Sequence, residues 1–163
     1  MKNRYLALWL ALICIVIFIL QLVIPGFTDS LILNQQALHG EIWRFVSAIF
    51  LHASFSHIIF NLFALLLFGL ILESIIGSKR FLIVFFASGI LANIISVFFY
   101  PSSLGASGAI FGVIGALTAI RPMMTIFVYS LPMPMFVAAI IWIIASVFGI
   151  FNPSTTGDIA HLS

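Results

Sequence analysis

Long apolar stretches, separated by short segments that contain polar residues, glycine or proline, make up most of this chain. About 20 apolar residues in helical form cross the roughly 30 Å hydrocarbon core of a bilayer. With the breaks taken as ends, the pattern predicts a series of membrane spans, the last of them incomplete. They cover approximately residues 5–24, 57–76, 81–100, 107–120, 134–149 and 158–163.

Two of the connections carry further signals. Residues 27–56 lean polar, and we expect an interfacial loop with a short amphipathic helix there. Pro122, Pro132 and Pro134 indicate a non-helical connection before the fifth span, which can begin near Pro134 because proline suits a first helical turn. Asp158 is well placed to be the N-cap of the sixth span.

The composition places the chain in the membrane. Of its 163 residues, 64% are hydrophobic and 6% are charged, which is too few charges for the surface of a soluble domain. Cys14 is the single cysteine, which rules out an internal disulfide and argues against a metal site built on cysteine. A net charge of +2 is too small to indicate a nucleic-acid partner. We therefore expect one all-α polytopic membrane domain over residues 1–163, with no cofactor and no metal.

Basic residues outside the spans predict the orientation. With alternating crossings they fall on one face, which the positive-inside rule makes cytoplasmic. They are Lys2 and Arg4 before the first span, Lys79 and Arg80 after the second, and Arg121 after the fourth. We expect a multi-pass protein of the cell membrane with a cytoplasmic N-terminus, and we expect the long first loop on the outer face.

Polar residues inside three spans enter the membrane from that outer side. His57 and Asn61 lie four residues apart, on one face of the second span. Ser107 opens the fourth span, and His161 lies just inside the sixth. Each of these side chains is costly in hydrocarbon unless it is satisfied, so we expect them to face one another or water.

The fourth span is short. As a helix, residues 107–120 measure about 21 Å, roughly 9 Å less than a typical core of about 30 Å. If Arg121 marks the inner surface, Ser107 lies below the outer one, and the irregular segment 101–106 is submerged with it. Such backbone is tolerated only where protein or a water-filled cavity covers it. A buried serine in a wet cavity is what hydrolysis inside a membrane requires.

Chemical roles can be assigned to this cluster. A serine hydroxyl is a poor nucleophile until a base takes its proton, and His161 is the candidate base. A developing oxyanion needs donors, which His57, Asn61 and the Ser107 N–H at a helix start could supply. Asp158 could orient His161, besides its capping role.

The chain resembles the rhomboid family of intramembrane serine proteases. A single motif such as G-x-S-G is weak, but the set is specific because its members occur in the order and at the spacing of the spans. The matching residues are Trp43-Arg44, the histidines and asparagine of HASFSHIIFN (His52, His57, Asn61), Gly105-x-Ser107-Gly108, and Ala160-His161. The resemblance runs from about Trp43 to the end of the chain.

The resemblance implies a six-helix bundle in the lipid bilayer that cleaves transmembrane segments of other proteins without a cofactor. It makes Ser107 the nucleophile and His161 the base of a Ser-His dyad, with His57, Asn61 and the Ser107 amide as the oxyanion hole. The supporting residues that it implies are Arg44, His52, Gly105, Gly108 and Phe111.

Two features depart from the family pattern. Phe111 stands where tyrosine is common, so its ring could stack on His161 without the hydroxyl's hydrogen bond. Only Leu162 and Ser163 follow His161, whereas the family continues through most of a helix. We expect the sixth helix to be truncated, and we expect the chain to be weakly active or inactive by itself.

Each assignment has a structural alternative. Ser107 could serve only close helix packing, and His57 with Asn61 could form a polar clamp between helices. The small residues of the packing face, on which we expect the sixth helix to rest, are Gly108, Gly112 and Gly115. Glu73 lies about 18 Å along the helix from Asn61, too far for the site. It could pair with Lys79 or Arg80, or cap a neighbouring segment.

Two other functions stay open. A rhomboid-like chain could bind membrane proteins without cleaving them. A small transporter could use His57, Asn61 and His161 for protons or a solute, although acidic residues would then be expected within the membrane, and only Asp158 at a boundary is near.

Overall fold

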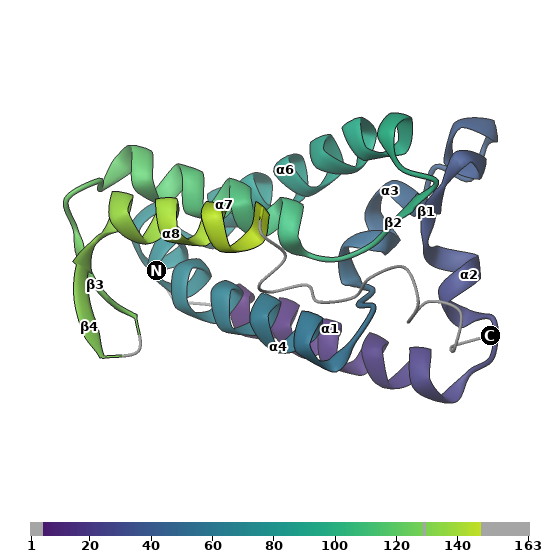
Figure 1. Ribbon diagram of the computed structural model, residues 1–163, viewed down its shortest axis with the longest axis horizontal. Coiled ribbons are helices and arrows are strands. Elements are labelled where there is room, and N and C mark those ends of the chain that lie inside the picture. Colours follow the sequence, from purple (N-terminus) through teal and green to yellow (C-terminus); the bar gives the residue numbers. More distant parts are fainter. Residues whose placement is uncertain (1–4, 129, 148–163) are drawn as a thin grey trace.

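The computed structural model describes residues 5–128 and 130–147, which form a bundle of apolar helices (Figure 1). Within these described residues, three helical segments are long and apolar enough to cross a membrane: α1 (Leu6–Val23), Phe55–Ile76, and α6 (Ser78–Phe99). The second of these consists of α4 (Phe55–Ala64), the π-helical turn η3 (Leu65–Gly69) and α5 (Leu70–Ile76). Shorter apolar helices follow, α7 (Ser107–Ile120) and α8 (Met135–Val147). The predicted multi-pass helical membrane fold is confirmed, and the predicted span 158–163 lies outside the described residues.

Glu73 holds the start of α1 against the end of α5. Its carboxylate accepts hydrogen bonds from the backbone N–H groups of Leu6 and Ala7, at 2.9 and 3.0 Å. The Ser78 hydroxyl donates to the same carboxylate at 2.6 Å. The first N–H groups of a helix have no partner within it and carry partial positive charge, so a carboxylate there stabilises the helix. Within the described part of the chain, Glu73 is therefore a helix cap, not a partner of Lys79 or Arg80.

Helices α6 and α7 pack at very close range through small residues. A Cβ atom added at Gly108 would lie 2.5 Å from Ala92 Cβ, and one at Gly112 would lie 2.1 Å from Ser88 Cβ. The structure packs these two glycines on α6, and the predicted contact of this face with the sixth helix stays a prediction because that helix lies outside the described residues. The two backbones of α6 and α7 can approach because Ser88 and Ala92 are also small and four residues apart. A Cβ at Gly115 would have no atom within 4 Å.

The long connection after α1 is built from several short pieces, whereas one short helix was predicted. The helical pieces are α2 (Phe27–Leu31), η1 (Gln35–His39), α3 (Arg44–Ser47) and η2 (Ala48–Phe50). Strand β1 (Leu33–Asn34) pairs antiparallel with β2 (Ser102–Ser103), the segment that leads into α7. The chain turns at Gly40, whose φ of 111° lies in the region that favours glycine. This loop is thereby tied to the segment that precedes Ser107.

The connection between α7 and α8 is non-helical, as the prolines predicted. It contains a hairpin of β3 (Thr125–Val128) and β4 (Leu131–Pro134), which was not predicted. Proline is tolerated in such a strand because a two-stranded hairpin has free edges at which no ladder donor is needed.

Candidate active site

His57 is placed by the start of α4. The Ser54 side chain accepts a hydrogen bond from the His57 N–H at 3.2 Å, so Ser54 is the N-cap of the helix. The helix therefore begins at Phe55, two residues before the predicted boundary at His57. The His57 side chain lies in the first turn and is only 6% exposed.

The hydrogen bonds of His57 determine which ring nitrogen carries the proton. The backbone N–H of Ala53 donates to His57 Nδ1 at 3.4 Å. An imidazole nitrogen that accepts a hydrogen bond carries no hydrogen, so the neutral ring bears its hydrogen on Nε2. The Nε2 atom of His57 is therefore a donor, as an oxyanion site requires.

Gly105 brings this nitrogen close to Ser107. A Cβ atom at residue 105 would lie 2.8 Å from both Nε2 and Cε1 of His57, and 3.8 Å from the Ser107 hydroxyl oxygen. The histidine donor and the serine oxygen thus border the same small space, and a side chain at Gly105 would occupy it. Gly105 also has a φ of 122°, a conformation that residues with a Cβ rarely adopt. Two independent requirements therefore call for glycine here.

Ser107 is the first residue of α7. Its backbone N–H, in the first turn, has no partner within the helix and lies at the positive end of the helix dipole. The segment before it is held by the Gly105 N–H, which donates to Ala48 O at 2.8 Å. The Ser107 side chain is exposed, and its depth in the membrane stays a prediction. The residue is open because it begins a helix and has glycines at positions 105 and 108 on either side.

Asn61 lies one helical turn after His57 and is 7% exposed. Its Nδ2 atom donates to the His57 backbone oxygen at 3.0 Å. An amide nitrogen has two hydrogens, so this bond positions the side chain and leaves the second hydrogen for a ligand. His57 and Asn61 thus lie on successive turns of α4.

His52 lies behind His57 and is fully buried. The two rings meet edge to face with centroids 5.2 Å apart. The Nδ1 atom of His52 donates to the Phe50 carbonyl at 3.1 Å. Burial, together with the nearby His57, lowers the pKa of His52 to about 3 from an ordinary value of 6.5. The ring is therefore neutral at physiological pH and acts as packing behind His57.

Gln21, which the sequence reasoning missed, holds His52 in place. Its Oε1 atom accepts from the His52 N–H at 2.9 Å, and its Nε2 atom donates to the His52 carbonyl at 3.2 Å. The same Nε2 donates to the Thr28 hydroxyl at 3.1 Å. The signal available in the sequence was an amide residue near the end of an otherwise apolar α1, since a polar group in such a helix needs a partner.

Arg44 is buried and organises the long first loop. Its guanidinium donates to the backbone oxygens of Asp29 and Ile32 at 2.8 and 2.7 Å. It also donates to Gln36 Oε1 at 3.0 Å and pairs with the Glu41 carboxylate. Arg44 thus has a structural role: it fixes the first loop. Strand β1 of that loop pairs with the segment before Ser107.

The remaining predicted residues divide into two groups. Gly108 packs against α6, and Phe111 is a partly buried residue of α7 one turn from Ser107. His161 and Asp158 lie outside the described residues. The structure therefore brings together Ser107, His57 and Gly105, with Asn61 one turn from His57 on α4, and the pairing of Ser107 with His161 stays a prediction.

Comparison with known proteins decides the family. A family model described as the Rhomboid domain matches residues 39–163, which is most of the chain. This chain belongs to the rhomboid family. The matched region contains all the residues predicted for the site, from Arg44 to His161. Rhomboid protease GluP of Bacillus subtilis (strain 168) is 34% identical over 124 residues, which are 71% of this chain and 24% of GluP.

Two rhomboid proteins of Toxoplasma gondii are also similar to this rhomboid chain. Rhomboid-like protease 3 is 36% identical over 81 residues, and Rhomboid-like protease 2 is 42% identical over 79 residues. These segments are 48% and 47% of this chain, but 31% and 28% of the two relatives. The chain therefore spans less than a third of the length of these relatives and of GluP.

Proposed function

We propose that this rhomboid chain is the catalytic core of a serine endopeptidase that cleaves transmembrane segments of other membrane proteins. One observation carries the proposal: His57 Nε2 and the Ser107 hydroxyl approach the same point beside Gly105, within 2.8 and 3.8 Å. A donor with a determined hydrogen and a potential nucleophile at a helix start are the parts that acyl transfer needs. The relatives' names, which call them proteases, support the same activity.

In the proposed reaction, Ser107 Oγ attacks the carbonyl carbon of the scissile peptide while His161 accepts the hydroxyl proton. Negative charge develops on the carbonyl oxygen, and the His57 Nε2–H, the second Asn61 Nδ2–H and the Ser107 N–H stabilise it. His161 returns the proton to the amine as the C–N bond breaks, which leaves an acyl-enzyme. A water molecule, deprotonated by His161, then hydrolyses the ester and restores Ser107.

The proposed substrates follow from backbone chemistry. An intact membrane helix keeps its carbonyl groups in its own hydrogen bonds, so Ser107 can reach only a segment that unwinds. Substrates should carry Gly, Pro or polar residues near one end of their span, with a small residue at the cut, as the family resemblance also implies. With the N-terminus in the cytoplasm, the site lies at the outer face of the cell membrane.

A serine-directed fluorophosphonate and a model transmembrane substrate in liposomes test the proposal together. We expect labelling and cleavage, weak in this chain by itself, that Ser107→Ala abolishes and Ser74→Ala leaves unchanged, since Ser74 is an exposed serine on α5. Folding of each variant is checked by its thermal unfolding. Cleavage retained in Ser107→Ala contradicts the nucleophile assignment. Folded protein with neither labelling nor cleavage, also after roughly fifteen to twenty apolar residues are added behind Ser163 to complete a span, favours a non-catalytic binder or a transporter.

A further inference from the structure

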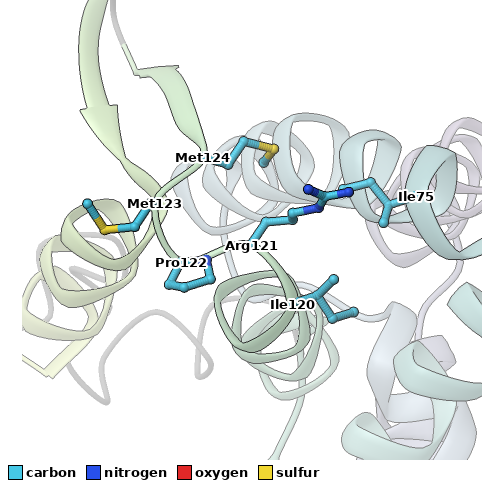
Figure 2. Close-up of a pocket in the computed structure, with 6 residues that line it drawn as sticks. All are labelled: Ile75, Ile120, Arg121, Pro122, Met123 and Met124. Atoms are coloured by element: carbon cyan, nitrogen blue, oxygen red, sulfur yellow. The ribbon is translucent and has the colours of Figure 1, made fainter.

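A cavity of about 600 Å³ lies at the end of α7 that is opposite Ser107 (Figure 2). Its lining joins three parts of the chain: the last turn of α5, the end of α7, and the segment that leads into the hairpin. The lining residues are Ile75, Ile120, Arg121, Pro122, Met123 and Met124. The volume is in the range of small-molecule sites, and all of the lining side chains except one are apolar. The cavity therefore suits a ligand that is largely apolar and has one anionic group.

Arg121 is the single charged side chain of this lining. It is exposed, and in Figure 2 its guanidinium reaches across the cavity toward Ile75. Within residues 5–128 and 130–147, the ion pair that is formed joins Arg44 to Glu41, and Arg121 has no acidic partner. Glu73 is nearby in the chain, but its carboxylate is engaged by the start of α1. The Arg121 guanidinium thus has its donors available for an anion, which it can bind through two parallel hydrogen bonds.

Other cations lie at the same level of the bundle. Gly108 meets Ala92 and Gly112 meets Ser88. The two helices are therefore antiparallel, and a residue four positions later in α7 faces a residue four positions earlier in α6. Continued to the end of α7, this antiparallel register places Ile120 level with Arg80. Lys79 and Arg80 are both exposed. Three basic residues therefore share one depth, where the headgroups of an anionic leaflet would be attracted.

The hairpin next to these cations carries exposed apolar side chains. In Figure 1, β3 and β4 run across the end of the bundle and project beyond the helices. Phe127 and Leu131 on this hairpin are 65% and 64% exposed. Exposed aromatic and aliphatic side chains next to basic residues are typical of the membrane interface. The cavity opens beside this segment, where its occupant would come from the lipid.

We propose that this cavity binds an anionic phospholipid. The phosphate lies on the Arg121 guanidinium, and the glycerol and first acyl methylenes lie against Ile75, Ile120 and Met123. The apolar lining disfavours free inorganic phosphate, because it offers nothing to replace the water around the rest of that ion. A choline headgroup adds a cation beside Arg121, Lys79 and Arg80, so an anionic headgroup is preferred over a zwitterionic one.

The test is native mass spectrometry of the full chain in detergent, titrated with phosphatidylglycerol or with phosphatidylcholine of the same acyl chains. We expect phosphatidylglycerol to bind about tenfold more tightly, because both lipids bring a phosphate to Arg121 but phosphatidylcholine adds a cation beside it. Arg121→Gln should remove that preference, and Arg121→Lys should keep most of it. Arg80→Gln is the matched control, because it removes one charge at the same depth outside the cavity. It should weaken binding by no more than about fivefold.

A second variant tests the cavity itself. Ile120→Glu places a carboxylate beside Arg121, and we expect it to abolish the preference for phosphatidylglycerol while Ile83→Glu, at an exposed position of α6, does not. Equal binding of the two lipids, or equal losses in Arg121→Gln and Arg80→Gln, overturns the proposal. So does displacement of the lipid by glycerol 3-phosphate at equal concentration, which would show a site for the soluble phosphate. A lipid-free dimer that Ile120→Glu dissociates would show that a second copy of the chain occupies the cavity.

Discussion

Replacement of Gly105 by alanine tests the geometry of the candidate active site. The new methyl group would lie 2.8 Å from His57 Nε2 and Cε1, closer than carbon atoms approach without repulsion, so the ring must move. The backbone φ of 122° adds strain of about 1–2 kcal/mol for a residue with a Cβ. Displacement of a catalytic donor by an ångström costs on the order of 10²-fold in rate, as does loss of one oxyanion donor. We therefore expect Gly105→Ala to lower kcat about 10²-fold and stability by about 1–2 kcal/mol.

Gly40→Ala separates the two effects. Gly40 has a similar φ of 111°, but a Cβ there would meet no atom within 4 Å. Its alanine variant should lose comparable stability and keep its activity. The assay is cleavage of a model transmembrane substrate in liposomes, with fluorophosphonate labelling of Ser107 and thermal unfolding on the same preparations. If Gly105→Ala retains activity within about twofold of Gly40→Ala, the space beside His57 is not the place where the reaction occurs.

Three further predictions concern stability. Glu73→Gln should lower the free energy of unfolding by about 1–3 kcal/mol, since it removes the carboxylate that caps α1, and an unchanged melting temperature would contradict the capping role. Because the pKa of His52 is about 3 in the folded chain and 6.5 ordinarily, the unfolded chain takes up its proton first, and stability should fall as the pH drops below 6.5. The contribution of His52 should be about 2 kcal/mol at pH 5, so the loss should be smaller by that amount in His52→Asn and unchanged in His39→Asn, which changes an exposed histidine; equal pH slopes in the two variants would show that other groups cause it. Gly112→Ala should destabilise the chain through its contact with Ser88, by about 1–3 kcal/mol. Ser88→Gly in the same chain should restore most of that loss, and a double variant no more stable than Gly112→Ala would place the clash elsewhere.

The helices of this rhomboid chain could be predicted closely. The boundaries predicted for the fourth span are those of α7, Ser107–Ile120. The second span begins at Phe55, not at His57, because the cap is the Ser54 side chain and serine in a polar run gives no distinct apolar edge. The loop after α1 was predicted least well. Its short pieces depend on Arg44 contacts with Asp29 and Ile32, 15 and 12 residues away.

The sequence predicted which residues belong to the candidate site, but it did not predict the contacts among them. His57, Asn61, Ser107 and His161 were chosen because polar groups in three apolar spans had to meet. That choice could not reveal that Ala53 determines the proton position on His57, or that Gly105 stands between the histidine and the serine. Gln21 was missed because its partner, the backbone of His52, is 31 residues away and has no side-chain signal.

Membrane class, helix order and the polar positions follow from the amino-acid sequence because hydrocarbon imposes a local requirement. Each backbone group must be satisfied within its own helix, and each span must therefore be apolar and long enough. The faces that helices present to one another were decided only by tertiary structure. Gly112 meets Ser88, and Glu73 caps a helix that begins 67 residues earlier. The partner of a glycine's bare Cα or of a buried carboxylate is a residue remote in the chain, and no local pattern specifies which one it is.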